Sequence, residues 1–285
     1  MAAFQPVTPE AINALPRPLA FVLPGGGALG AYQVGVIRSL THAGVAPDML
    51  IGVSAGAVNA SLFAWNQGPD GVRRIESVWR SIQRRDLIRF NPVRLALAVA
   101  GRRPSFLDNE PGRRFLRQQL GTRLLEHAPV PLALVATDLA TGSTVPLQRG
   151  DAVTAVLASA AFPGVYPPVE IDGRLLIDGG VVADVPLDLA ASLGVRSVLV
   201  LSVPPTLEAR PPRHAIDILL RSSSLGVEAH GRTALLRVPD GLMVAEVPAS
   251  ASHLNTFDVG RSAAMIDLGA AATDAWLGND DGVLQ

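Results

Sequence analysis

Residues 49–60 read MLIGVSAGAVNA, and this stretch decides the fold class. The apolar run 48–53 is followed at once by the small-residue segment 55–65, which predicts a buried strand, a tight turn and a helix packed closely on a sheet. The turn is Gly52-Val53-Ser54-Ala55-Gly56, a G-x-S-x-G motif whose glycines permit the strained backbone that presents a serine hydroxyl at a helix amino terminus. Ser54 is therefore the candidate nucleophile. In the alternative interpretation, Ser54 only caps the helix.

A similar strand, loop and helix precede this stretch. Residues 19–23 are an apolar run, the loop reads Gly25-Gly26-Gly27-Ala28-Leu29-Gly30, and apolar residues then recur at helical spacing as far as residue 43. Backbone amides converge at such a helix start, where the helix dipole favours an anion. With Ser54 as nucleophile that anion is the tetrahedral oxyanion, so the loop residues Gly25, Gly26, Gly27, Ala28 and Gly30 are the predicted oxyanion hole, with the amides of Gly26, Gly27 and Ala28 as the expected donors.

The same loop also matches the G-x-G-x-x-G pattern of dinucleotide sites. Those sites place an acidic residue, which binds ribose, about 20 residues later at the end of the second strand. Here that position is occupied by Gly52-Val53-Ser54, and the nearest acid, Asp48, precedes the strand. The pattern therefore favours the oxyanion interpretation over the dinucleotide one.

A serine hydroxyl needs a base within hydrogen-bond reach, and Asp178 is the best candidate. Ile177-Asp178-Gly179-Gly180 follows the predicted strand 174–177, and the paired glycines let the backbone turn while the carboxylate is presented at the strand end. The simpler interpretation of Asp-Gly is an Asx-turn, which the elbow and the glycine loop elsewhere in the chain make less favourable. An ordinary carboxylate pKa near 4 predicts that activity persists on the acid side of neutrality.

The five histidines offer an alternative base. His253 is the only one placed late enough for the order of an α/β-hydrolase triad, and a loss of kcat/KM with an apparent pKa near 6.5 would favour it. The others lie in predicted helices or loops without a surrounding motif and are interpreted as surface residues: His42, His127, His214 and His230.

The composition is that of an ordinary globular protein, with 285 residues, 48% hydrophobic, 17% charged and a net charge of −1. Neither a basic field nor a motif indicates nucleic acid as a partner. The chain has no cysteine and no lysine, which excludes disulfides, a thiol nucleophile and a Schiff base. Further strands are predicted at 131–137, 144–148, 174–177, 197–203 and 242–247. Their alternation with helices predicts one α/β domain with a mostly parallel, doubly wound sheet.

Residues 73–123 form a basic segment with 13 arginines against four acidic residues. Within it, Ile75, Val78, Trp79 and Ile82 mark an apolar stripe at helical spacing. One interpretation is a solvated helix with a single buried face. The other is a basic, aromatic-bearing surface that meets anionic headgroups at a membrane.

Residues 1–18 contain no basic region followed by an apolar stretch, so no secretory signal is predicted and the expected compartment is the cytoplasm. Glycine, proline and polar residues interrupt the three long uncharged runs, 18–37, 49–69 and 152–169. These interruptions favour buried core elements over membrane-spanning helices.

The glycine loop, the G-x-S-x-G elbow and the Asp-Gly-Gly motif, in this order, resemble the patatin-like phospholipase family. The similarity extends through residues 25–40, 51–60 and 158–186. The resemblance implies a three-layer α/β/α patatin-like fold with a mostly parallel central sheet, a Ser54–Asp178 dyad, neither metal nor cofactor, and a phospholipid or other fatty acyl ester as substrate. Many relatives carry Arg or Lys where this chain has Leu29, so electrostatic help to the oxyanion is expected to be smaller here.

The layout of the family also predicts how the chain is divided. Residues 19–203 are expected to form the catalytic core, with the Arg-rich segment 73–123 as a helical insertion. Residues 204–285 carry no recognisable motif and are expected to complete the same domain with helices and a strand.

The predicted reaction has two steps. Ser54 attacks the ester carbonyl as Asp178 takes its proton, and Asp178 then activates water to hydrolyse the acyl-enzyme. Two alternatives remain open: an acyltransferase that uses the same acyl-enzyme, and a non-catalytic lipid-binding protein.

Overall fold

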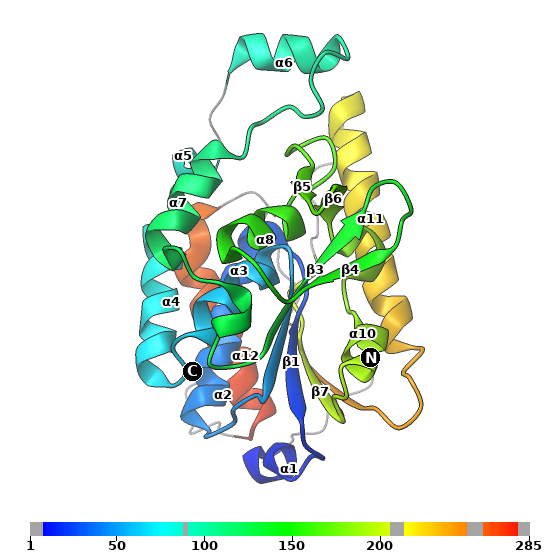
Figure 1. Ribbon diagram of the computed structural model, residues 1–285. Coiled ribbons are helices and arrows are strands. Elements are labelled where there is room, and N and C mark those ends of the chain that lie inside the picture. The colour runs from blue at the N-terminus through cyan, green and yellow to red at the C-terminus, as the bar shows by residue number, and fades with distance from the viewer. Residues whose placement is uncertain (1–7, 88–90, 206–213, 250–258, 279–285) are drawn as a thin grey trace.

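A computed structural model of the chain describes residues 8–87, 91–205, 214–249 and 259–278. In these residues an eight-stranded sheet has the order β5-β6-β3-β2-β1-β7-β8, with β4 paired to β3 (Figure 1). The strands are β1 (Leu19–Leu23), β2 (Met49–Val53), β3 (Leu132–Asp138), β4 (Thr144–Leu147), β5 (Val169–Ile171), β6 (Arg174–Asp178), β7 (Ser197–Leu201) and β8 (Met243–Val247).

The sheet is mostly parallel, as predicted. Strands β3, β2, β1, β7 and β8 run parallel to one another, whereas β4 and β6 are antiparallel to β3, and β5 is antiparallel to β6. The sequence did not predict β5, which has only three residues and directly follows Pro167 and Pro168. The antiparallel edge holds Asp178, because β6 ends on that residue.

Side chains of the central strands alternate between two hydrophobic cores. In β1, Leu19, Phe21 and Leu23 contribute to one core and Ala20 and Val22 to the other. Both faces are therefore covered, as expected for parallel strands that read as continuous apolar runs.

Helices cover the two faces and complete the three-layer α/β/α architecture (Figure 1). The first face carries α2 (Gly30–His42), α3 (Ala55–Ala64), α4 (Pro69–Ser81), α7 (Glu110–Leu120), α8 (Ala152–Ser159) and α12 (Ser262–Trp276). The second carries α9 (Gly180–Ala183), α10 (Leu187–Ser192) and α11 (Ala215–Leu235). The remaining elements are α1 (Pro9–Asn13), α5 (Arg84–Leu87), α6 (Pro92–Val99) and the short 3-10 turns Gly27–Leu29, Leu125–His127 and Val259–Arg261.

The C-terminal elements join the same sheet and core. Strand β8 extends the sheet beyond β7, and α12 packs along α2. Two glycines allow this close packing: a Cβ atom at Gly35 would overlap the carbonyl oxygen of Ile266, and one at Gly269 would overlap that of Tyr32. No helix in the described residues is long and apolar enough to span a membrane.

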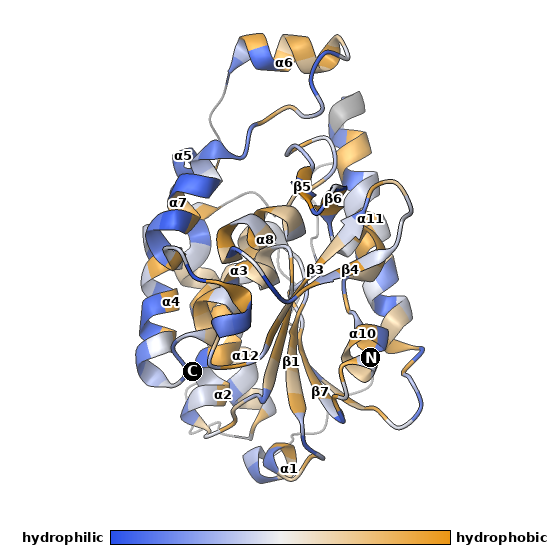
Figure 2. Cartoon of the chain, viewed as in Figure 1, coloured by the Kyte–Doolittle hydropathy of each residue, from blue (hydrophilic) through white to orange (hydrophobic). Residues whose placement is uncertain are grey.

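The apolar stripe of the basic segment is an internal feature. Ile75, Val78 and Trp79 are buried on α4, so this aromatic side chain does not contribute to a surface. Helix α6, in contrast, has no buried residue and projects from the body of the molecule, and Figure 2 shows that most of its residues are hydrophobic.

Candidate active site

Ser54 lies in a sharp turn between β2 and α3. Its backbone has φ 54° and ψ −119°, a conformation that L-residues rarely adopt. Both flanking glycines are required by close backbone packing, since a Cβ atom at Gly56 would overlap the carbonyl oxygen of Leu23 and one at Gly52 would lie 2.7 Å from that of Gly56. The G-x-S-x-G motif is thus a strained elbow that presents the serine side chain at the carboxyl end of β2.

Asp178 lies across β3 from this elbow and meets the serine directly. The Ser54 hydroxyl donates a hydrogen bond of 2.7 Å to Oδ2 of Asp178, although 124 positions separate the two residues. The other carboxylate oxygen, Oδ1, accepts the amide of Gly180 at 2.9 Å. A Cβ atom at Gly179 would overlap the carbonyl oxygen of Val135 on β3, so glycine is needed for this turn.

Burial changes the acidity of this carboxyl group. Asp178 is 3% exposed, and loss of solvation raises its pKa to about 6, against the lowering effect of the Ser54 and Gly180 hydrogen bonds. The ordinary pKa near 4 expected from the sequence is therefore wrong. An acid limb near pH 6 is now expected for Asp178 too, so a pH profile alone does not separate Asp178 from a histidine base.

The glycine loop begins beside the serine. A Cβ atom at Gly25 would lie 3.3 Å from Cβ of Ser54, and the Gly25 amide donates a hydrogen bond of 2.8 Å to Oδ1 of Asp184. Within the described residues, the amides of Gly26, Gly27 and Ala28 have no acceptor, whereas that of Gly30 bonds within the 3-10 turn. These three amides are available to a ligand.

A buried polar network fixes both ends of the loop. The Gln33 side-chain amide donates to the carbonyl of Pro24 at 2.8 Å, and that of Asn59 donates to the carbonyl of Gly30 at 2.8 Å. Asn59 also donates to Gln33 at 2.9 Å and accepts the Trp79 indole N–H at 2.7 Å. No sequence motif links these polar residues to the loop.

Ser159 supports the elbow from the end of α8. Its hydroxyl accepts the Ser54 amide at 3.0 Å and donates to the carbonyl of Val135 at 2.6 Å. The sequence places Ser159 in the segment that resembles the family, but only the fold shows that it contacts the elbow.

The sequence model of patatin-like phospholipases matches residues 21–191. The chain belongs to the patatin-like phospholipase family.

The relatives of this patatin-like chain are longer proteins. An uncharacterised NTE family protein of Mycobacterium bovis is 32% identical over 228 residues, which cover 76% of this chain and 60% of that protein. Patatin-like phospholipase domain-containing protein 7 of Rattus norvegicus is 29% identical over 187 residues, 65% of this chain and 13% of that protein. Among solved structures, VipD from Legionella pneumophila has a TM-score of 0.45 at 13% identity, covering 93% of this chain and 67% of that chain.

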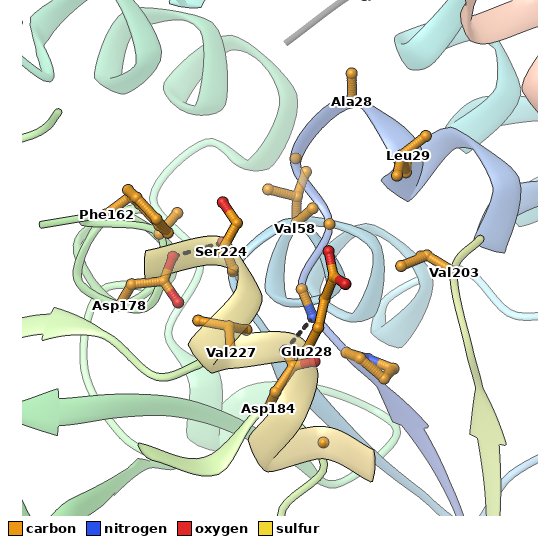
Figure 3. Close-up of a pocket in the computed structure, with 18 of the residues that line it drawn as sticks. Ala28, Leu29, Val58, Phe162, Asp178, Asp184, Val203, Ser224, Val227 and Glu228 are labelled. Atoms are coloured by element: carbon orange, nitrogen blue, oxygen red, sulfur yellow. Dashed lines mark hydrogen bonds between the residues drawn. The ribbon is translucent and has the colours of Figure 1, made fainter. Parts of the chain in front are cut away.

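A cavity of about 540 Å³ opens beside Ser54 and Asp178. Figure 3 shows Asp178, Asp184 and Glu228 around it, with α11 forming one wall. Most of its lining is apolar and includes Val78, Trp79, Leu87, Phe115, Leu116, Val156, Leu157, Phe162, Val165, Val203, Val227 and Leu235. Leu29, the last residue of the 3-10 turn in the glycine loop, is buried.

None of the histidines that the structure describes lines this cavity. His230 is exposed, and its Nδ1 lies 3.0 Å from the carbonyl oxygen of Val181. His253, the alternative base, lies outside the described residues. In the described parts of the chain, no group of three or more histidine and acidic side chains is placed to hold a metal ion.

Proposed function

We propose that this protein is a serine hydrolase of fatty acyl esters in phospholipids or related lipids. The observation that carries the proposal is the 2.7 Å hydrogen bond from Ser54 to Asp178, at the edge of an apolar cavity beside three unused amides. Membership of a phospholipase family supports lipid ester hydrolysis as the activity.

The geometry supports a two-step reaction. Ser54 attacks the ester carbonyl while Oδ2 of Asp178 accepts its proton, and the leaving alcohol takes that proton away. Water, deprotonated by Asp178, then attacks the acyl carbonyl, the bond to Ser54 breaks to release the fatty acid, and Ser54 takes the proton back from Asp178. The amides of Gly26, Gly27 and Ala28 form the proposed oxyanion hole, and each such donor lowers a barrier by about 3 kcal/mol.

The cavity supports a long apolar acyl group as the part of the substrate that is recognised. Its apolar walls converge on Ser54 from α4, α7 and α8. Each methylene buried there contributes about 0.8 kcal/mol. We therefore expect kcat/KM to rise with acyl chain length until the cavity is filled.

The proposal is tested with a p-nitrophenyl acyl-ester series and a fluorophosphonate label read by intact mass. Wild type is expected to turn over and to gain one label, Ser54→Ala to do neither, and Asp178→Asn to lose activity and label slowly. His253→Gln is the matched control for the alternative base and is expected to retain activity. If Ser54→Ala hydrolyses the esters like wild type, the proposed dyad is wrong. It is also wrong if His253→Gln loses this activity while Asp178→Asn retains it.

The same samples separate the alternative functions. Transfer of the acyl group to added glycerol or lysolipid would identify an acyltransferase. Binding of Ser54→Ala to liposomes, together with an inactive wild type, would identify a lipid-binding protein.

We also propose that the end of the molecule that carries α6 contacts an anionic lipid surface. Leu87 and Asn109, which precede and follow α6 in the sequence, both line the cavity, and Figure 1 shows α6 projecting from one end of the molecule. On α6, Val93 is 67% exposed and Val99 70% exposed. Exposed arginines flank this helix and form no ion pair among the described residues: Arg84, Arg85, Arg102 and Arg103.

Vesicle sedimentation tests this contact. A Val93→Asp/Val99→Asp variant is expected to lose binding to phosphatidylglycerol vesicles while hydrolysing a soluble ester normally. Arg102→Gln/Arg103→Gln is expected to weaken binding about 30-fold, since each arginine near an anionic surface contributes about 1 kcal/mol. The matched control is Leu236→Asp/Val238→Asp, which changes two exposed apolar residues just after the C-terminal end of α11. Equal binding by the α6 variant and this control would refute the assignment.

A further inference from the structure

Asp184 is a carboxyl group of the cavity wall that the proposed reaction does not use. It directly follows α9, and its Oδ1 accepts the Gly25 amide at 2.8 Å, from a residue 159 positions earlier (Figure 3). Gly25 is held between two side chains, because a Cβ atom there would lie 3.1 Å from Oδ1 of Asp184 and 3.3 Å from Cβ of Ser54. The hydrogen bond to Asp184 thus holds Gly25, the first glycine of the loop, against Ser54.

We propose that Asp184 is a positioning residue of the oxyanion loop, which holds the Gly25 amide so that the next three amides stay beside Ser54. This inference rests on the proposed ester hydrolysis. By taking up the Gly25 amide, Asp184 also defines which amides of the loop remain for the oxyanion. Without this acceptor, the first residue of the loop has no hydrogen bond from the α9 side to hold it against the elbow.

The surroundings of Asp184 favour its neutral form. A Cβ atom at Gly180 would lie 3.2 Å from Oδ1 of Asp178 and 3.3 Å from Oδ1 of Asp184, so these two carboxyl groups are close neighbours. Glu228 faces Asp184 from α11, but its charge is already paired with Arg221 at 3.3 Å and Arg232 at 3.9 Å. Asp184 itself has no ion-pair partner in the residues that the structure describes.

These groups separate the two carboxyls in acidity. Loss of solvation, and then repulsion by Asp178 and Glu228, raise the pKa of Asp184 to about 7, against the lowering effect of the Gly25 amide. The pKa of Asp178 is about 6. Burial raises the pKa of both carboxyls, and Asp184 is also repelled by Asp178 and Glu228, so Asp178 is expected to ionise before Asp184 as the pH rises.

Ionisation of Asp184 would place a second negative charge beside the position of the oxyanion. Such a charge opposes the developing negative charge of the transition state. We therefore expect a bell-shaped pH profile of kcat/KM, in which Asp178 sets the acid limb and Asp184 the alkaline limb.

The test compares Asp184→Asn, which keeps an acceptor for Gly25, with Asp184→Ala, which does not. Asp188→Asn, an exposed carboxyl on α10, is the matched control. We expect Asp184→Ala to lose kcat at least about tenfold with KM nearly unchanged, as for a weakened oxyanion hole. Asp184→Asn is expected to keep kcat within about threefold at pH 6.5 and to lose the alkaline limb.

Hydrogen exchange of the peptide covering residues 24–30 gives a readout that needs no activity. Faster exchange in Asp184→Ala than in wild type and Asp184→Asn supports the proposal. Unchanged exchange and kcat in Asp184→Ala, or an unchanged alkaline limb in Asp184→Asn, overturns it. An inactive wild type with the expected exchange pattern refutes the hydrolase proposal alone, so the two failures are distinguishable.

Discussion

Replacing Asp178 by Asn is expected to stabilise the protein while it abolishes activity. Burial raises the pKa of Asp178 from 3.8 to about 6, so the folded state disfavours the charged carboxylate. The stability that this group contributes is complete below pH 3.8 and is lost as the pH rises through about 6. At about 1.4 kcal/mol per pKa unit, the loss is about 3 kcal/mol at pH 7.

Asparagine carries no charge, and its amide can take over both hydrogen bonds, accepting from Gly180 and donating to Ser54. Wild type and Asp178→Asn should therefore have nearly equal free energies of unfolding at pH 4. At pH 7, Asp178→Asn should be about 3 kcal/mol more stable than wild type. Urea unfolding of both proteins across this range measures the difference, and Asp188→Asn controls for an exposed carboxyl. A constant difference between pH 4 and pH 7 would refute the idea that burial sets the acidity of this base.

Two further predictions concern residues that shape the site and the core. Gly35→Ala is expected to destabilise the protein by about 3 kcal/mol or more, because the added Cβ overlaps the backbone of α12. In the control Gly226→Ala on α11, the added Cβ meets no atom within 4 Å, so this change should be neutral or slightly stabilising. Thermal unfolding of the two variants measures the difference, and equal melting temperatures would contradict the prediction. Ser159→Ala is expected to cost about 1–3 kcal/mol and to lower kcat, because the Ser54 amide loses its acceptor. Urea unfolding and ester hydrolysis measure both effects, and a Ser159→Ala variant as stable and active as wild type would show that the elbow holds its shape without this bond.

The local elements of the fold could be predicted because their signals are short-range. The apolar run before Ser54 and the small residues after it predicted β2 and α3, and β1 was placed at 19–23 as the structure has it. Strand direction could not be predicted in the same way. The alternation of strands and helices does not show that β6 returns antiparallel to β3, because this depends on pairing between residues about 40 positions apart.

The contact between Ser54 and Asp178 could be predicted because a motif marks each residue, whereas contacts that only the fold brings about were missed. Ser54 and Asp178 each lie in a glycine-flanked motif and meet as expected. Asp184, Ser159 and Asn59 act on the elbow and the loop from distant parts of the chain, and no local pattern marks them. The acidity of Asp178 was missed for the same reason, since burial by the surrounding elements is not visible in the sequence. The division of the chain at residue 203 stays a prediction.

The place of Asp178 and Ser54 on either side of β3 makes the contact between these two residues a reporter of how the chain folds. Val53 pairs with Val135, and Asp178 pairs with Ala136, on opposite edges of that one strand. The parallel β2–β3 pair closes a connection of more than 70 residues, which is a slow event in folding because long loops lose much entropy on closure. A slip of β6 by one residue would turn its side chains to the other face of the sheet. Recovery of ester hydrolysis during refolding would therefore time the completion of this three-strand register, which far-ultraviolet dichroism, sensitive mainly to helices, does not resolve.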